Sequence, residues 1–213
     1  MKLDNGFMTG CDSETEWQLP WFVENFKKHN DTHLLVVDFG MSREMAKWAG
    51  KNVDSLADMS TAKAKGWFLK PVAMMNTPFT KTVWIDTDCE VLGNIQSLFD
   101  LIAGDKLNMV LDRPWSKKFN TTMYNSGIVG FQRKPGILAK WASGVDPSKH
   151  RGDQEALHMM LDDLQRMVFI NELPHKYNVL RLDHLSGTAP ANRLVNHWTG
   201  SKGNQHIRSL MNE

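Results

Sequence analysis

Hydrophobic positions along the chain follow a strand period in some stretches and a helix period in others. Residues 6–12 and 34–38 are short apolar runs that end in small or polar residues, as strands do. Between them, apolar residues recur at helical spacing, with Pro20 near the start of the run. This helical face consists of Leu19, Phe22, Val23 and Phe26. A strand, a helix and a strand in this order predict a parallel βαβ unit, and therefore an α/β fold.

The same alternation continues to the end of the chain. Ser42 is a typical helix cap, Gly50 a typical helix end, and Pro71 a typical first helical residue. We expect a connector at 53–59 and a polar loop at 113–122. The chain from Leu173 onward is rich in turn-forming residues up to the last helix. Further strands are predicted at 82–91, 108–112, 124–131 and 167–170. Helices are predicted at 42–50, 95–102, 136–142, 153–164 and 206–211, with a short one from Pro71.

Length and composition describe an ordinary globular protein. The 213 residues suit one domain, whether as a whole protein or as part of a longer chain. Hydrophobic residues at 41% and charged residues at 23% argue against disorder. The net charge of +1 gives no reason to expect nucleic-acid binding, although Lys63, Lys65 and Lys70 form a local basic group.

Cysteine usage and hydropathy bear on the compartment. Cys11 and Cys89 lack the spacing of a metal site, so we expect free thiols in a reducing compartment, with a disulfide as the alternative. No apolar run is long enough for a transmembrane helix, and the first six residues do not resemble a signal peptide. We therefore expect a cytoplasmic protein without a transmembrane segment.

Three acids follow the most hydrophobic part of the predicted strand 82–91. In an extended chain Asp86, Asp88 and Glu90 would share one side, about 6 to 7 Å apart. Like charges this close repel, and a divalent cation with oxygen ligands relieves the repulsion. The alternative is a polar strand end at the surface.

Four short motifs occur in an order that resembles a known family. They are Asp86-Thr87-Asp88, Tyr124-Asn125-Ser126-Gly127, Gly152-Asp153-Gln154 and Asn196-His197-Trp198-Thr199-Gly200-Ser201-Lys202. The order resembles the GT-A glycosyltransferases, most closely the retaining enzymes of family 8, over nearly the whole chain from Thr9 to Lys202. The chain also looks like compact glycosyltransferases of bacteria and of large DNA viruses that infect algae, where such enzymes build capsid glycans. The resemblance implies one GT-A domain over 1–213, with a Rossmann-like mixed sheet flanked by helices.

The resemblance also implies a metal site. In family 8 the Asp-x-Asp aspartates and a late histidine bind Mn²⁺, which binds the diphosphate of a UDP-sugar; here these are Asp86, Asp88 and His197. A mixed carboxylate and imidazole set suits Mn²⁺ better than Mg²⁺, which is the alternative. Without the flanking motif, His197 would read as an ordinary loop histidine.

Other residues match the positions that bind the donor. Thr9 and Asp12 fall where the family binds uridine, at the end of the first strand. Lys202 matches a lysine that contacts the diphosphate, and Gly200 lets the backbone approach it closely. Lys70 stands where the family often has arginine, so the bidentate contact is lost. Both lysines have a solvated surface position as the alternative.

The sugar itself would be held by the middle motifs. Asn125, Asp153 and Gln154 match residues that bind sugar hydroxyls, and Gln154 matches the residue beside the anomeric carbon. A neutral amide is a poor nucleophile, so a front-face reaction suits this chain better than a double displacement, although Asp153 or Asp112 could supply a carboxylate. Asp153 has a helix cap as its alternative role. Residues 173–178 resemble a family segment on the acceptor side, or else form only a turn.

The sequence therefore predicts a metal-dependent glycosyltransferase. It would move a hexose from a UDP-sugar to a glycan or protein-linked glycan, such as one on a capsid or surface glycoprotein, with retention of configuration; a viral enzyme would act in the host cytoplasm. One alternative is a phosphohydrolase of the haloacid dehalogenase type, whose Asp-x-Asp motif normally lies near the start of its domain. A nucleotidyltransferase would need a Gly-rich loop after the first strand, which is absent here. The remaining alternative is a sugar-binding module without turnover.

Overall fold

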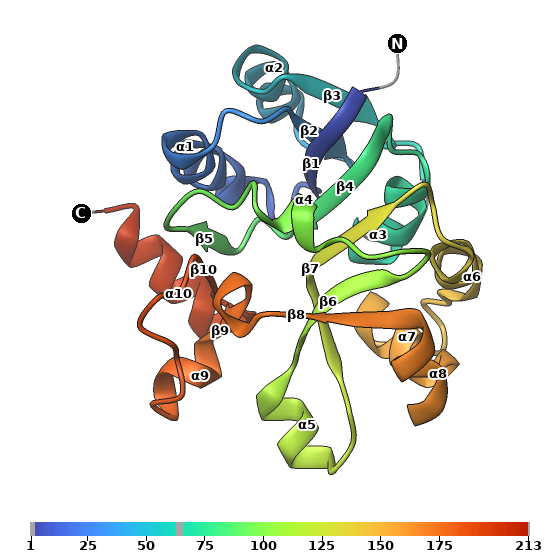
Figure 1. Cartoon of the computed structure of the whole chain (residues 1–213). Helices are drawn as coiled ribbons and strands as arrows, with labels where there is room; N and C mark the ends of the chain where they lie inside the picture. The colour runs from blue at the N-terminus through green and yellow to red at the C-terminus, as the bar shows by residue number, and fades with distance from the viewer. Residues whose placement is uncertain (1–2, 63–65, 213) are drawn as a thin grey trace.

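A mixed sheet of seven strands forms the centre of the computed structural model, which describes residues 3–62 and 66–212 (Figure 1). Lys63 and Lys65 of the predicted basic group lie outside the described residues. The strand order is β3-β2-β1-β4-β7-β6-β8. The bounds are β1 Leu3–Cys11, β2 Leu34–Asp38, β3 Ser55–Asp58, β4 Phe79–Ile85, β6 Leu107–Leu111, β7 Tyr124–Gln132 and β8 Ile170–Leu173.

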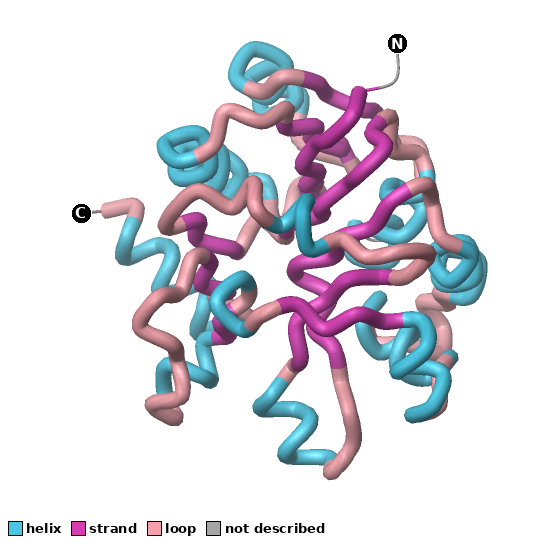
Figure 2. Tube along the Cα trace, viewed as in Figure 1, coloured by secondary structure: helices cyan, strands magenta, loops and turns pink. Residues whose placement is uncertain are grey.

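Helices cover both faces of this sheet (Figure 2). The predicted βαβ unit is confirmed, because β1 and β2 pair in parallel on either side of α1 in the chain. No helix among the described residues is long and apolar enough to cross a membrane. The helices are α1 Leu19–His29, α2 Arg43–Asn52, α3 Gly66–Met75, α4 Leu98–Leu101, α5 Arg113–Phe119, α6 Gly136–Gly144, α7 Asp153–Met160, α8 Asp163–Phe169, α9 Arg181–Leu185 and α10 Gly200–Leu210.

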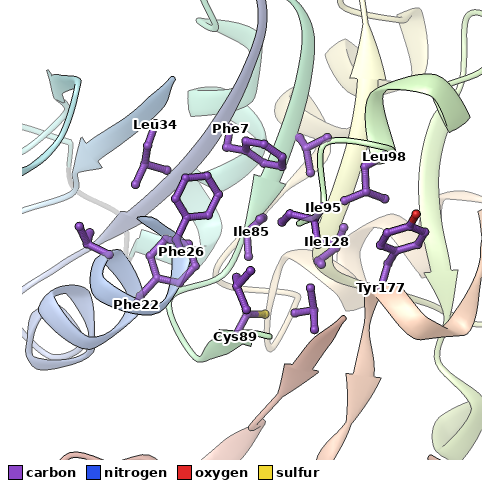
Figure 3. Close-up of a cluster of buried hydrophobic side chains, with 14 of the residues drawn as sticks. Phe7, Phe22, Phe26, Leu34, Ile85, Cys89, Ile95, Leu98, Ile128 and Tyr177 are labelled. Atoms are coloured by element: carbon purple, nitrogen blue, oxygen red, sulfur yellow. The ribbon is translucent and has the colours of Figure 1, made fainter. Parts of the chain in front are cut away.

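Alternating side chains of the strands build two hydrophobic clusters, one on each face. Phe7 of β1 packs into the cluster that includes Phe22 and Phe26 of α1, and Figure 3 shows these rings with Ile85 of β4. The next residue, Met8, points to the other face, where α3, α6 and α7 supply Leu69, Trp141 and Leu157 among others. Strands buried on both faces are typical of α/β sheets.

Strand direction brings polar residues to one edge of the sheet. β7 pairs antiparallel with both β4 and β6, while the other pairs in the sheet are parallel. The first residues of β7, including Asn125 and Ser126, therefore lie beside the last residues of β4 and β6. The carboxyl edge of an open α/β sheet is the usual position of a ligand site.

A second, three-stranded sheet adds residues from the end of the chain to this edge. It consists of β5 (Cys89–Val91), β10 (Val195–His197) and β9 (Val179–Leu180) in the order β5-β10-β9. β10 pairs antiparallel with β5, which places His197 opposite Cys89. A histidine late in the chain thereby lies next to the Asp-x-Asp motif.

The predicted strand 82–91 is wrong in one respect that matters for the site. It is two strands, because the chain turns at Asp86-Thr87-Asp88, where the amide of Cys89 donates to the carbonyl of Asp86 at 3.1 Å. The three acids do not share one side of an extended strand. Glu90 lies in the second sheet and accepts hydrogen bonds from Asn196 Nδ2 at 2.9 Å and Trp198 Nε1 at 3.1 Å.

Two predicted helical regions also differ. Residues 153–164 form two helices, since Asp162 accepts from the amide of Gln165 at 2.8 Å and starts α8 with a capping box. α8 continues to Phe169, so the strand predicted at 167–170 begins only at Ile170. The predicted loop 113–122 contains α5, because Asp112 caps it and Pro114 suits its first turn.

Smaller differences concern element ends. Pro71 lies inside α3 and removes one helical hydrogen bond, in a helix held in place by buried neighbours such as Phe68 and Leu69. α2 runs past Gly50 to Asn52, and the connector 53–59 contains β3, which gains its hydrogen bonds by pairing with β2. The helix predicted at 95–102 is reduced to α4, and the terminal helix begins earlier, at Gly200.

Candidate functional site

A cavity of about 430 Å³ opens at the carboxyl edge of the large sheet. Its volume falls in the usual range for small-molecule sites. The walls come from the ends of β1 and β4, from α3, from the start of α7 and from α10. The lining residues are Gly10, Cys11, Asp12, Thr15, Gln18, Phe39, Gly66, Trp67, Lys70, Trp84, Asp86, Thr87, Asp88, Arg151, Gly152, Asp153, Gly200 and Asn204.

Lys70 is a buried cation at the base of the site. Its Nζ lies 3.1 and 3.2 Å from the two carboxylate oxygens of Asp86 and 2.9 Å from Oδ2 of Asp153. It also donates to the carbonyl and hydroxyl oxygens of Ser126, at 3.0 and 3.2 Å. Burial alone would lower the pKa of Lys70, but the two carboxylates outweigh burial and raise it. Lys70 therefore stays charged and joins three elements of the sheet edge.

Asp86 is fixed in direction by a second donor. Trp84 Nε1 donates to its Oδ1 at 2.6 Å, and the Asp86 amide donates to the carbonyl of Gly127 at 2.9 Å. Burial raises the pKa of Asp86, while Lys70 acts against this rise. With 28% of its side chain exposed, the carboxylate still faces the cavity.

Asp88 and His197 form the second charged pair of the site. Nε2 of His197 lies 3.1 Å from Oδ1 of Asp88. Burial would lower the pKa of His197, but the carboxylate of Asp88 outweighs burial and raises it. The imidazole fills the space above Gly127, because a Cβ at that position would collide with its Cε1 and Nδ1 atoms. Glycine at position 127 is therefore required by the close approach of His197.

A chain of amide side chains supports His197 from behind. Its Nδ1 lies 3.0 Å from Oδ1 of Asn178, whose Nδ2 donates to Oδ1 of Asn125 at 2.8 Å. Because Nδ2 of Asn178 is the donor toward Asn125, its oxygen must be the acceptor toward His197. Nδ1 of His197 therefore carries a proton, and Nε2, which faces Asp88 at 3.1 Å, is the ring nitrogen that could bind a metal after losing its own proton.

Asn125 continues this chain to the middle of the site. Its Nδ2 donates to Oε1 of Gln154 at 3.0 Å and to Oδ2 of Asp112 at 3.3 Å, and its Oδ1 also accepts from the Gly127 amide at 2.9 Å. Gln154 accepts a second bond from the Ser126 amide at 3.1 Å and donates to Oδ2 of Asp112 at 3.0 Å. The side chains of Asn125 and Gln154 are thus held rigidly.

The chemistry of the donor set fits a divalent metal ion. Asp88, Cys89 and His197 offer ligand atoms within 4.8 Å of one another. We discount Cys89, because its side chain is buried in the hydrophobic cluster of Figure 3 and burial raises its pKa well above the ordinary thiol value. Asp88 and His197 supply the carboxylate and imidazole ligands, and the fixed tautomer of His197 is what a metal ligand requires. Asp86 lines the same cavity but pairs with Lys70.

Comparison with solved structures identifies the fold. The glycosyltransferase GlyE of Streptococcus pneumoniae TIGR4 superposes with a TM-score of 0.71 at 16% identity, over 93% of this chain and 55% of that one. The galactosyltransferase LgtC, in complex with donor and acceptor sugar analogs, gives 0.65 at 14% identity over 97% and 95% of the two chains. Mouse xyloside xylosyltransferase 1 gives 0.60 at 14% identity over 93% and 98%. The chain has the GT-A glycosyltransferase fold.

No protein-family model and no curated protein sequence matches the chain. The chain also spans only about half the length of GlyE, 55%. The predicted Rossmann-like mixed sheet of a GT-A fold is confirmed, and the likeness concerns the fold alone.

The GT-A fold brings many of the predicted site residues together. Asp86, Asp88, Lys70, Asp153 and Gly200 line the cavity. Asp12 lines it too, with Oδ1 accepting from the Thr15 amide at 3.2 Å in a turn after β1. Asp153 does not serve as the helix cap, because Gly152 is the residue before α7 and the Asp153 carboxylate pairs with Lys70.

Five predicted residues are not among those that line the cavity, and His197 is one of them, since it reaches the cavity only through its contact with Asp88. Thr9 is completely buried, and Asn125 uses both oxygen lone pairs and both amide protons inside the protein, so neither is free for a donor contact. Lys202 is exposed on α10 and does not line the cavity. Gln154 lies behind Asn125 and Ser126 and does not line it either.

Sequence reasoning missed other lining residues. Gln18 accepts from the Thr87 hydroxyl at 2.7 Å and donates to Asn204 at 2.9 Å, which joins the Asp-x-Asp turn to α10. Trp67 and Arg151 also line the cavity. Gln18 and Asn204 have no distinctive sequence signal, whereas Trp67, three residues before Lys70, and Arg151, in the basic loop before Asp153, are residue types that suit a sugar or phosphate site.

Proposed function

We propose that this chain is a metal-dependent glycosyltransferase that moves a hexose from a UDP-sugar to a glycan acceptor with retention of configuration. The observation that carries the proposal is the cavity at the carboxyl edge, where the Asp88 and His197 pair stands beside the Asp86, Lys70 and Asp153 cluster. A nucleotide diphosphate needs cations, and a sugar needs fixed hydrogen-bonding groups, and this cavity offers both. The structures of similar fold are named as galactosyl- and xylosyltransferases, which supports sugar transfer as the reaction class.

Each group of residues has a role in this proposal. Bound Mn²⁺, or Mg²⁺ as the alternative, would be held by Asp88 and His197 with Asp86 beside them, and would offset charge on the leaving diphosphate. Arg151, on the cavity wall, and Lys202, on the exposed side of α10, add positive charge toward the phosphates. Asp12 and the backbone of Gly10 would contact the nucleoside at the end of β1.

The state of the carboxylates favours a front-face reaction. Asp153 is ion-paired with Lys70, and Asp112 is 1% exposed with both oxygens in hydrogen bonds, so neither is a free nucleophile. Gln154 is a fixed neutral amide that would act through Asn125 and the Ser126 backbone, which it bonds, and not as a nucleophile. The departing phosphate oxygen would then accept the proton of the acceptor hydroxyl as the new bond forms on the same face of the sugar.

Calorimetric titration of UDP into metal-stripped protein, with and without added Mn²⁺, tests the proposal. We expect binding that requires Mn²⁺ and is lost in Asp88→Asn, because the substitution removes a carboxylate ligand. Asp105→Asn, at an exposed position, is the matched control and should bind as the wild type does. UDP binding without Mn²⁺ dependence, or unchanged binding in Asp88→Asn, contradicts the metal site.

Turnover separates the transferase from the other classes. A transferase releases free sugar and UDP slowly from its UDP-sugar when no acceptor is present. Release of inorganic phosphate from simple phosphate esters would instead indicate a phosphohydrolase. Binding of UDP-sugar without any cleavage would indicate a sugar-binding module.

A further inference from the structure

Helix α5 presents an aromatic pair that the hydrophobic core does not use. None of the residues 113–119 is buried, and Trp115 and Phe119 are 40% and 53% exposed. Their ring centroids lie 5.2 Å apart with the planes at 11°, an offset stack. Nζ of Lys118 lies 4.6 Å from the centre of the Trp115 ring. α5 lies in the connection between β6 and β7, which extends away from the large sheet (Figure 1).

One carboxylate connects this pair to the middle of the site. Asp112 accepts the Trp115 amide through Oδ1 at 3.1 Å and the side-chain amide of Gln154 through Oδ2 at 3.0 Å. The backbone of Trp115 is therefore only one carboxylate away from Gln154. Helix α5 is therefore bonded to the hydrogen-bond network that supports the site, although it contributes no residue to the lining of the donor cavity.

We propose that Trp115 and Phe119 form a platform for the acceptor, on which a sugar ring of an acidic glycan stacks. The apolar C–H face of a sugar suits an exposed aromatic ring, and aromatic residues are common in the walls of ligand sites. Lys117 and Lys118 are exposed on the same helix and would meet carboxylate or phosphate groups of the glycan. The assignment of this glycan as the acceptor rests on the proposed glycosyltransferase activity, whereas its binding to α5 does not.

Binding to an array of purified oligosaccharides, both neutral and acidic, tests the platform with fluorescently labelled protein. We expect the wild type to bind a set of acidic oligosaccharides, and Trp115→Ala/Phe119→Ala to bind them about tenfold more weakly. Leu164→Ala/Met167→Ala is the matched control, because these side chains are 75% and 72% exposed on α8 and should not affect binding. The double variant should melt like the wild type, since α5 buries no residue.

Several outcomes overturn the platform. It is overturned by a wild type that binds no oligosaccharide on the array, or by a double variant that binds as the wild type does. Sedimentation with phosphatidylserine vesicles that depends on Trp115 and Phe119, without glycan binding, would assign the surface to a membrane instead. Calorimetry with UDP and Mn²⁺ on the same variants keeps the two proposals apart: loss of glycan binding with normal UDP binding concerns the platform only, and the reverse result concerns only the proposed function.

Discussion

At the scale of single residues, the site depends on side chains whose polar groups are held by neighbours on several sides. His197 has Asp88 at one ring nitrogen and Asn178 at the other. Asn178 is 1% exposed and reaches Asn125, so the chain of amides behind the imidazole is shielded from water. Hydrogen bonds of this kind fix a ligand before any metal arrives, which lowers the cost of binding.

Asn178→Ala should weaken Mn²⁺ binding about 10- to 100-fold, because Nδ1 of His197 loses the acceptor that fixes its proton. Titration of Mn²⁺ into the metal-stripped variant measures the affinity, and ¹⁵N NMR of the metal-free ring, at a pH above the raised pKa of His197, reports the tautomer. Asn52→Ala, on α2, is the control for loss of an exposed amide. Equal affinity and an unchanged tautomer in Asn178→Ala would show that the amide has no such role.

Gly127→Ala should displace His197, because the added Cβ meets the imidazole carbon and nitrogen atoms. We expect loss of Mn²⁺-dependent UDP binding and a decrease of about 1–3 kcal/mol in the free energy of unfolding. Chemical denaturation and calorimetry provide the two readouts. The control is Gly136→Ala, since a Cβ there meets no atom within 4 Å. Normal UDP binding by Gly127→Ala would place the metal away from His197.

At the scale of elements, caps decide where helices begin when the hydrophobic pattern is ambiguous. Apolar residues continue at helical spacing across 153–164, but the chain leaves the helix at Leu161 and starts again after Asp162. The capping box between Asp162 and Gln165 satisfies amides that a continuous helix would bond internally. Asp112 likewise caps α5 through its Oδ1 atom, while its Oδ2 atom accepts a hydrogen bond from Gln154.

Asp162→Ala should lower the free energy of unfolding by about 1 kcal/mol, because α8 loses the side chain that accepts its Gln165 amide. Urea denaturation measures the change. Asp105→Ala removes an exposed acid that caps no helix and should leave stability nearly unchanged. If both variants denature at the same urea concentration, the cap does not hold this helix start.

At the scale of the whole molecule, Lys70 joins parts of the chain that are distant in sequence. From α3 it contacts Asp86 after β4, Ser126 in β7 and Asp153 at the start of α7. Its side chain is 3% exposed, so the ion pairs are little screened by water. Removal of one member leaves buried charge without compensation.

Lys70→Met should lower the free energy of unfolding by about 3 kcal/mol, near the lower end for a broken buried pair because Asp86 is 28% exposed. Lys70→Arg keeps the positive charge and should lose less. Lys140→Met, at an exposed position on α6, controls for the change of side chain and should have little effect. Equal stability of Lys70→Met and the wild type would mean that the buried charges are compensated by other groups.

The sequence by itself determined the elements whose signals are local. The helix 19–29, the strands 34–38 and 124–131 and the parallel βαβ unit follow from periodicity and capping, and the structure confirms them. The order of the motifs predicts that Asp88 and His197 meet, and Nε2 of His197 lies 3.1 Å from Oδ1 of Asp88. Periodicity is a property of consecutive residues, so it can be recognised in the sequence without knowledge of the fold.

Only the tertiary structure decided which groups meet. The Asp-x-Asp turn, the removal of Glu90 to the second sheet and the contact of Lys70 with Asp153 depend on pairings between distant segments. Asn125 looked like a sugar contact because its type suits one, but burial and four internal hydrogen bonds make it a support for the site. The sequence shows how many hydrogen bonds a side chain can make, because this number depends on the residue type alone. Strand order and packing determine which groups become its partners.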